Sequence, residues 1–383
     1  LAGAAFLAGA RTAMVTDIGG TTTDISLLQN GAPRLKPDGA LVGGWQTMVE
    51  AADIRTSGLG GDSEVCPVSR GTVGGLNLGP RRAMPLSLLA TQWPGLKGKL
   101  KEQFGVVVPM ATDGRFILPI MPKGVPKWLT RTEARLAKKA IEMGPTAIAE
   151  IAATQLALGA VDRLIGRGLL ALAAFTPTDA LHVTGDFDQF DGEAAELGAA
   201  LIARQKNGMG ETTAESPEKL AAMTLAELYR RSAMVLMDAA LAHDGMGEGQ
   251  ASSNPLLHDL YREGVGGVDN LVELSPILRT EVVALGASAR THYTHVAKLM
   301  GAKLIVPEHA DVAGAVGAAV GSVRQRVVIT VSQPSQGRYR VHLPSGPKDL
   351  VVMEKALELA RSSATEIAKG RARQAGAHKI TIT

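Results

Sequence analysis

The segment TDIGGTTTDIS (16–26) sets glycines, threonines and aspartates side by side, directly after a short apolar run. Gly19 and Gly20 can take φ > 0 and let a phosphate approach the backbone without a Cβ in the way. Thr21 and Thr22 add hydroxyls and backbone N–H donors. The pattern predicts a strand, a phosphate-binding bend and a return strand, with a ligand-free hairpin turn as the alternative.

Asp17 ends the first of these strands, where its carboxylate would face the phosphates. Two negative groups repel each other unless a divalent cation lies between them, so Asp17 predicts a hydrated Mg²⁺ held largely through water. A second bend, TSGLGGDSEV (56–65), offers Gly60 and Gly61 as further phosphate contacts and Asp62 as a second metal ligand. The alternative for Asp62 is a turn with solvated acids.

A third segment, VVALGASARTHYTHVAKLMG (282–301), predicts a buried strand, a bend of small residues and an amphipathic helix. Gly286, Ala287 and Ser288 leave a slot for the purine and ribose of an adenosine. His292 and His295 lie three apart on the helix, a spacing that suits a metal ion. Because no third ligand is evident, core or surface histidines are the preferred interpretation.

The elements around these bends alternate between strand and helix. The hydrophobic pattern predicts strands at 13–16 and 24–29, followed by an Asn30-Gly31 hairpin turn. Farther along, it predicts helices at 191–206 and 217–243, a strand at 281–285, a helix at 291–300, a strand at 303–307 and a Gly/Ala-rich helix at 311–321. This order is typical of an α/β fold.

Two further parts differ from this pattern. Thr130 and Glu133 form a capping box, and three helices fit in 130–168 before a strand at 169–175, the order of a winged helix-turn-helix. The helix at 155–168 carries few residues that could read bases, which favours a structural or partner-docking insertion over DNA binding. The tail 327–383 shows strand, strand, long helix and strand, so it predicts a small α+β domain.

The composition bounds the class of protein. With 383 residues, 45% apolar and 20% charged, the chain is long enough for two or three soluble domains. Its net charge of +3 is spread along the sequence, which argues against nucleic acid as a partner. The single cysteine, Cys66, excludes an internal disulfide and a thiolate cluster, which suits a cytoplasmic protein. No apolar run is long enough for a bilayer, and the missing initiator Met suggests a start inside a longer product.

In this order, DIGGTTTDIS, ALGASAR and ADVAGAVGAAVG resemble the second phosphate loop, the adenosine loop and the last connecting helix of the second lobe of the actin, heat-shock chaperone and sugar kinase ATPase superfamily, a ribonuclease H-like fold. Five blocks narrow the resemblance to the hydantoinase A / 5-oxoprolinase family: DIGGTTTDI, IRTSGLGGDSEV, LGPRRAMPLSLLA, FTPTDALHVTG and VPEHADVAGAVGAAVG. The resemblance implies a discontinuous actin-like ATPase lobe at 1–126 and 175–322. It further implies a winged-helix-like insertion at 127–174 and an α+β domain at 323–383.

The resemblance also implies an activity. Such proteins resemble ATP-dependent hydrolases that open cyclic amides such as hydantoins and 5-oxoproline. ATP would phosphorylate the amide oxygen, with Mg²⁺ present, and water would then open the ring. The resemblance implies a hydantoinase B-type partner and leaves open whether the chain forms a homo-oligomer. Neither nucleic acid nor a membrane is expected as a partner. In TPTDALH, Asp179 matches a family block and joins Asp17 as a candidate catalytic residue, although it could instead cap the following helix.

Two departures from the family matter. Its earlier lobe, with its own D-x-G-G-T-x-T-D loop, has no counterpart before Leu1, so the chain alone is expected to bind nucleotide weakly. Asp62 replaces the third glycine of the second bend. Two other functions stay open, a non-catalytic ATPase-fold regulator and a sugar-kinase-like transcriptional repressor. The repressor is disfavoured because the helical insertion is internal and the chain has a single cysteine.

Overall fold

The computed structural model describes residues 1–36, 39–42, 45–69, 71, 74–121, 124–247, 249–261, 276–321 and 325–382. They form the predicted mixed α/β chain, which divides into two compact units, Leu1–Ala318 and Ala319–Thr383. The predicted boundary between residues 322 and 323 lies outside the described residues. No helix in these ranges is both long and apolar enough to cross a membrane. That the first unit is an actin-like lobe stays a prediction.

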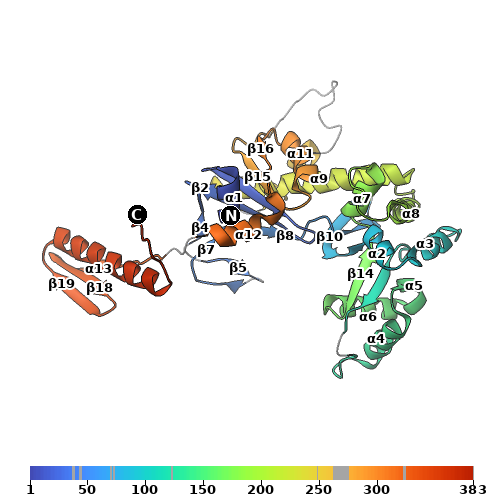
Figure 1. Ribbon diagram of the computed structural model, residues 1–383, viewed down its shortest axis with the longest axis horizontal. Helices are drawn as coiled ribbons and strands as arrows, with labels where there is room; N and C mark the ends of the chain where they lie inside the picture. The colour runs from blue at the N-terminus through green and yellow to red at the C-terminus, as the bar shows by residue number, and fades with distance from the viewer. Residues whose placement is uncertain are drawn as a thin grey trace. The chain divides into compact units, whose positions relative to one another are not determined.

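The first unit is built on a mixed sheet with the strand order β16-β15-β1-β2-β3, in which β8 also pairs with β2 (Figure 1). Strands β16, β15 and β1 run parallel, and β2 joins β1, β3 and β8 in antiparallel fashion. The strands are β1 (Ala13–Ile18), β2 (Thr23–Gln29), β3 (Ala32–Pro33), β8 (Ile54–Ser57), β15 (Val282–Leu285) and β16 (Leu304–Ile305). Asn30 and Gly31 have φ of 53° and 75°, which confirms the predicted hairpin turn.

Helices cover both faces of this sheet. The first face carries α9 (Pro217–His243) and α11 (Ala289–Leu299), and the second carries α1 (Ala2–Ala8) and α12 (Ala313–Val320), which follows the 3-10 turn Ala310–Val312. Successive side chains of a strand point to opposite faces, so Met14 packs into the first core and Val15 into the second. The second core is tight, because a Cβ on Gly3 would collide with the carbonyl oxygen of Ala313. The small residues predicted at 311–321 therefore serve close helix packing.

A third apolar core lies beyond the sheet, around Leu86, Phe116, Phe175, Leu201 and Leu220. It is enclosed by β9 (Ser63–Pro67), β10 (Leu76–Arg82), α2 (Leu86–Gln92), α3 (Leu96–Phe104), α7 (Pro177–Thr184), α8 (Gly192–Ala203) and the first half of α9. Two short antiparallel pairs, β4 (Leu35–Lys36) with β7 (Ala51–Ala52) and β5 (Leu41–Val42) with β6 (Trp45–Gln46), come before β8 in the sequence. The helices predicted at 191–206 and 217–243 are present as α8 and α9.

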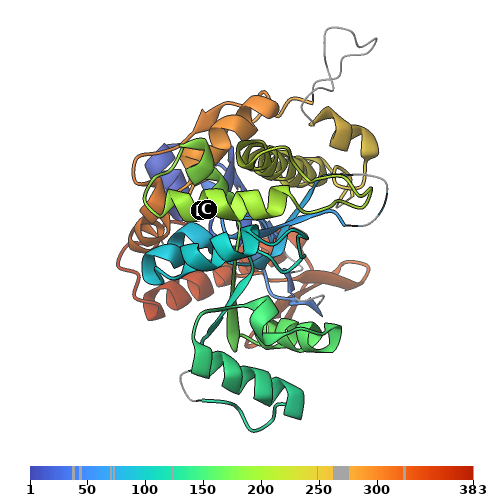
Figure 2. The ribbon, with the colours of Figure 1, turned by 90° about the vertical axis from the view of Figure 1, so that its right-hand side faces the viewer.

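The helical insertion contains α4 (Arg131–Met143), β13 (Thr146–Ala147), α5 (Ile148–Ile151), α6 (Gln155–Gly166) and β14 (Leu170–Ala174) (Figure 2). Its sheet has the order β11-β14-β12-β13, in which β11 (Met84–Pro85) and β12 (Phe116–Pro119) come from outside 127–174. The predicted capping box of Thr130 and Glu133 is present. Glu133 also accepts from Arg163 Nε at 2.7 Å and pairs with Arg167 at 3.1 Å. These two arginines therefore hold α6 against α4, which argues against a nucleic-acid role for them.

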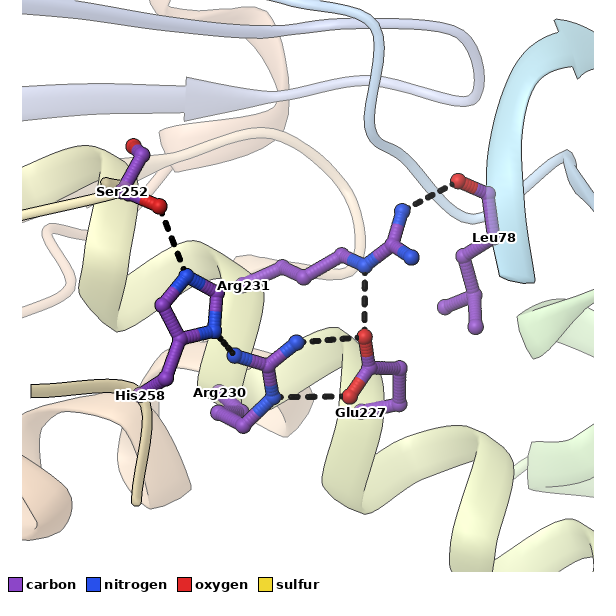
Figure 3. Close-up of polar contacts among 6 residues, drawn as sticks. All are labelled: Leu78, Glu227, Arg230, Arg231, Ser252 and His258. Atoms are coloured by element: carbon purple, nitrogen blue, oxygen red, sulfur yellow. Dashed lines mark hydrogen bonds and ion pairs between the residues drawn. The ribbon is translucent and has the colours of Figure 1, made fainter. Parts of the chain in front are cut away.

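Polar contacts fix α9 to its neighbours (Figure 3). Glu227 accepts from both guanidinium groups that follow it, from Arg230 Nη2 at 2.7 Å and from Arg231 Nε at 2.6 Å. Arg231 donates onward to the carbonyl oxygen of Leu78 on β10 at 2.7 Å. Arg230 Nη1 lies 2.7 Å from Nδ1 of His258, on α10 (Pro255–Leu260). The two arginines that Glu227 holds thus link α9 to a strand on one side and to a short helix on the other.

The second unit packs one helix on a three-stranded sheet. Its elements are β17 (Val331–Ser335), β18 (Arg338–Leu343), β19 (Gly346–Leu350) and α13 (Met353–Gln374), with Val341, Ala356 and Ala360 buried between sheet and helix. The strand predicted at the C-terminus is wrong over 379–382, and the strand predicted at 327–331 begins only at Val331. The third strand is GPKDL, whose proline and charges hide it from a hydrophobic pattern.

Candidate functional site

The bend after β1 and the bend after β15 lie together. The two strands are parallel neighbours, with Asp17 opposite Leu285, so both bends follow the same end of the sheet. Gly286 has φ of 105°, and a Cβ there would collide with the carbonyl oxygen of Ile18 and lie 3.5 Å from Oδ1 of Asp17. Its backbone N–H donates to the carbonyl oxygen of Ala310 at 3.0 Å. A residue larger than glycine would separate the two bends.

The second glycine bend supports the first. The N–H groups of Gly61 and Asp62 donate to the carbonyl oxygens of Gly19 at 3.2 Å and Gly20 at 2.7 Å. A Cβ on Gly60 would collide with these same two carbonyl groups. The sequence predicted that Gly60 and Gly61 contact phosphate. Instead, Gly60 packs closely against the backbone of the first bend, and the N–H group of Gly61 donates to that backbone.

The first bend has backbone N–H groups that are available to a ligand. Gly19 N–H donates to the carbonyl oxygen of Thr22 at 2.9 Å, which closes the bend. In the part of the chain that the structure describes, the N–H groups of Gly20, Thr21 and Thr22 donate to no protein acceptor. Successive unpaired N–H groups in a bend form a concave site for an anion. The bend thus has the donors that a phosphate requires.

A row of three polar side chains crosses the sheet beside this bend. Asp17 stands opposite Asp24 on β2, and Asp24 stands opposite Thr56 on β8. Thr56 Oγ1 donates to Asp24 Oδ1 at 2.5 Å. The side chain of Asp17 is exposed, yet partial burial and the charge of Asp24 raise its pKa above the ordinary value. The sequence suggested Asp17, but the pairing with Asp24 follows only from the strand register.

This pair of carboxylates fits a hydrated Mg²⁺. Mg²⁺ is bound in many phosphate sites by one or two carboxylates and several waters. A cation beside Asp17 would also offset the repulsion that raises its pKa. Among the described residues, no three His, Cys, Asp or Glu groups gather as a fuller metal site. Asp17 and the neighbouring Asp24 therefore suit a hydrated Mg²⁺ whose remaining ligands are water molecules.

Asp62, the second metal ligand expected from the sequence, has another partner. Its Oδ2 accepts from Arg82 at 3.1 Å through Nη2 and at 3.3 Å through Nε. The same carboxylate fills the space that a side chain on Gly20 would need. A carboxylate neutralised by a guanidinium is a poor ligand for a cation. Asp62 thus fits a structural role beneath the bend better than a metal site.

Two buried hydroxyl contacts hold the bend from the opposite face. Thr16 Oγ1 lies 2.5 Å from the hydroxyl of Tyr293 on α11, and both residues are fully buried. Thr23 Oγ1 donates to the carbonyl oxygen of Leu59 at 2.7 Å. These contacts fix both strand ends that flank the phosphate-type bend. The alternating small polar residues of 16–26 were the one sequence signal for them.

Asp179 occupies a structural position. It is fully buried, and its carboxylate accepts from Thr176 N–H and Oγ1 in the capping box of α7. It also accepts from the N–H groups of Leu86 at 3.1 Å and Ser87 at 2.8 Å, which begin α2. Burial raises the pKa of Asp179 to about 6, although these hydrogen bonds oppose the rise. A side chain that caps two helices and reaches no solvent does not fit the catalytic role expected from the sequence.

The neighbouring Thr178 connects α7 to the glycine bends. Its N–H and its Oγ1 both donate to the carbonyl oxygen of Gly61 at 2.9 Å. Because Gly61 in turn donates to Gly19, a continuous set of hydrogen bonds runs from α7 through the second bend to the first. The TPTDALH block therefore supports the site from behind.

The adenosine-type bend opens onto solvent. Ala287 is exposed, and Ser288 precedes the first turn of α11 without capping it through its side chain. His292, on the same helix, is buried, and burial together with nearby His295 lowers its pKa to about 4. The ring of His295 stacks on Tyr229 with centroids 4.7 Å apart. His292 is thus a core histidine and His295 an exposed one, both beside Tyr229, in keeping with the interpretation of core or surface histidines.

Comparisons with known proteins bear on this site. A model of the hydantoinase/oxoprolinase family matches residues 1–96. No curated protein matches the chain. Among solved structures, a nucleotide-free acetone carboxylase, described with the mechanism of ATP-dependent acetone carboxylation, aligns at 16% identity with a TM-score of 0.46. The alignment covers 96% of this chain and 36% of the carboxylase chain, so this chain spans about a third of that length. Over the residues that carry Asp17 and both glycine bends, the chain matches the hydantoinase/oxoprolinase family that its sequence blocks indicated.

Proposed function

We propose that this chain supplies the nucleotide-binding part of an ATP-dependent enzyme that opens cyclic amides of the hydantoin or 5-oxoproline type. The observation that carries the proposal is the contact of Gly286 with Ile18 and Asp17, which joins a phosphate-type bend and an adenosine-type bend at one sheet edge. The family match over 1–96 supports the class of reaction.

The roles follow from the available groups. The free N–H groups of Gly20, Thr21 and Thr22 would donate to the phosphates. Asp17, with Asp24 beside it, would hold a hydrated Mg²⁺, which would offset phosphate charge when bound. Gly286, Ala287 and Ser288 would border the sugar and base. Gly60, Gly61, Asp62 and Asp179 would act indirectly, by fixing the bends and the helices behind them.

The chemistry would use the phosphoryl group to activate a carbonyl. The γ-phosphoryl group of ATP would bond to the amide oxygen as its bond to ADP breaks and the amide nitrogen loses its proton. A first water would add to the activated carbon, and the ring C–N bond would break with the proton passing to the amine. A second water would release inorganic phosphate from the resulting acyl phosphate. Phosphate therefore appears only when a cyclic amide is consumed.

We also propose that this chain works as part of a larger assembly. This chain spans about a third of the acetone carboxylase chain, and the family that its sequence blocks resemble has an earlier ATPase lobe. That lobe and a hydantoinase B-type partner would complete the nucleotide and amide sites. The whole enzyme would work in the cytoplasm, and self-association stays part of the proposal. The isolated chain would then bind nucleotide weakly.

The test is phosphate release by the full-length protein with its hydantoinase B-type partner. Hydantoin, 5-oxoproline and 2-pyrrolidinone are supplied as cyclic amides, and acetone with bicarbonate tests ketone carboxylation. The expected result is amide-dependent phosphate release that is lost in Asp17→Asn. Release that responds only to acetone and bicarbonate would replace the amide assignment. Nucleotide binding with no turnover on any compound would favour the non-catalytic regulator.

A further inference from the structure

Both residues that flank Asp17 on β1 contact the segment that carries the adenosine-type bend. Gly286, in that bend, lies so close to Ile18 that a Cβ would collide with the carbonyl oxygen of Ile18. Seven residues farther along, on α11, the hydroxyl of Tyr293 lies 2.5 Å from Oγ1 of Thr16. This segment therefore holds β1 on each side of Asp17, where the phosphate-type bend begins.

The contact of Thr16 with Tyr293 lies behind the nucleotide-type site and not within it. Thr16 shares a strand face with Met14 and Ile18, which pack into the core under α9 and α11. Asp17 points to the other face and is exposed. Thr16 and Tyr293 are both fully buried, so neither side chain can touch a ligand at the bends. Any effect of Tyr293 on a ligand must therefore act through the position of the backbone.

A single nucleotide would depend on how far apart the two bends lie. Adenosine would occupy only the adenosine-type bend, and pyrophosphate only the phosphate-type bend. ATP joins both parts covalently, so its affinity exceeds that of the parts only if the two bends lie at a matching distance. The alternative is an ordinary core hydrogen bond that stabilises the fold and has no separate effect on ATP.

We propose that Tyr293 is a positioning residue that, through Thr16, fixes the adenosine-type bend at the distance from the phosphate-type bend that ATP requires. The inference rests on the function proposed above, because it takes ATP as the ligand of both bends. The backbone contact of Gly286 with Ile18 fixes one side of Asp17, and the hydroxyl contact fixes the other. Loss of the hydroxyl contact would leave each bend intact and change only their relative position.

Calorimetric titration of the full-length protein with its hydantoinase B-type partner tests the inference. The probes are a non-hydrolysable ATP analogue with Mg²⁺, adenosine, and pyrophosphate with Mg²⁺. Thr16→Val and Tyr293→Phe each remove one hydroxyl, and both should weaken the ATP analogue about tenfold while adenosine and pyrophosphate change less than about twofold. Thr16→Ser keeps the hydroxyl and loses only a buried methyl group, so it should bind the analogue as the parent protein does although it is less stable.

Two more variants separate positioning from stability. The double variant Thr16→Val/Tyr293→Phe leaves no unpaired hydroxyl, so its free energy of unfolding should recover towards that of the parent protein, whereas its affinity for the ATP analogue should stay low. Thr224→Val is the matched control, because Thr224 is fully buried and donates to the carbonyl oxygen of Leu220 at 2.9 Å within α9. It should lose stability and keep the affinity of the parent protein.

Affinity that simply follows stability would overturn the inference, as would equal weakening of the ATP analogue and its two parts. In the first case the affinity for the analogue would fall in Thr16→Ser and recover in the double variant. Unchanged binding of the analogue in Tyr293→Phe would overturn it as well. A parent protein that binds neither the analogue nor either part would instead remove the proposed function.

Discussion

Asp17 and Asp24 stand directly opposite each other on the antiparallel strands β1 and β2, at the edge where the first glycine bend begins. Opposed like charges on neighbouring strands are destabilising, and Asp24 contributes to the raised pKa of Asp17. Asp24 is in turn held by Thr56. Such a pair costs stability when no cation is bound, which is a common feature of sites that bind one.

The first prediction concerns Asp17→Asn. Because burial and Asp24 raise the pKa of Asp17, the ionised form is disfavoured in the folded chain, and the amide should leave the free energy of unfolding at pH 7 unchanged or slightly higher. Phosphate release by the complete enzyme should fall at least about 100-fold. Urea unfolding and phosphate release measure the two effects, with Glu142→Gln on α4 as the control. A loss of stability that parallels the loss of turnover would contradict the cation-binding role.

The second prediction concerns the contact of the two bends. Gly286→Ala should destabilise the first unit by about 2 kcal/mol or more, because the methyl group meets the Ile18 carbonyl and φ is 105°. Gly185→Ala is the matched control, since Gly185 has φ of 80° but open space around it, and should cost only about 1 kcal/mol. Chemical denaturation measures both. Equal losses would mean that the close approach of the bends contributes nothing.

Local patterns in the sequence predicted the strands and bends well, but they did not predict contacts between residues that are far apart in the sequence. Gly19 and Gly20 after an apolar run identify a bend, because strand alternation acts within a few residues. Neither glycine takes the φ > 0 expected from the sequence, and at Gly20 it is the Asp62 carboxylate that leaves no room for a side chain. The hydrogen bond of Thr16 to Tyr293 spans 277 positions, so no local pattern contains it. In the same way, no local pattern contains the hydrogen bond between Arg82 and Asp62, which lie 20 positions apart, and this bond makes Asp62 a poor metal ligand.

Asp179 shows the same contrast between local contacts, which the sequence predicts, and long-range contacts, which it does not. The capping box with Thr176 is local and was open as an alternative, whereas the bonds to Leu86 and Ser87 depend on how two distant segments meet. The last predicted strand failed for a different reason. An alternating segment such as KITIT becomes a strand only if a neighbouring strand is there to pair with it, and β19, which the pattern missed, occupies one edge of that sheet.

The third prediction separates the two interpretations of Asp179. Asp179→Asn places amide hydrogens against the N–H donors that begin α2 and α7, so it should cost about 2–4 kcal/mol of unfolding free energy. Asp191→Asn keeps an amide oxygen that can cap α8 and loses a partly exposed ion pair with Lys97, so it should cost less than about 1 kcal/mol. Turnover per folded molecule should persist in both variants. Unchanged stability with abolished turnover in Asp179→Asn would restore the catalytic interpretation.

The fourth prediction concerns the pH dependence of stability through His292. Burial, with His295 nearby, lowers its pKa from 6.5 to about 4, so between these values the unfolded chain takes up a proton that the folded chain refuses. This contribution to stability is present above pH 6.5 and is lost as the pH falls, by about 2 kcal/mol at pH 5. His292→Leu should therefore lose less stability than the parent chain between pH 7.5 and 5. His309→Asn, an exposed control whose φ of 63° suits asparagine, should follow the parent chain. Parallel curves for all three proteins in urea unfolding would show that His292 is protonated as readily in the folded chain as in the unfolded one.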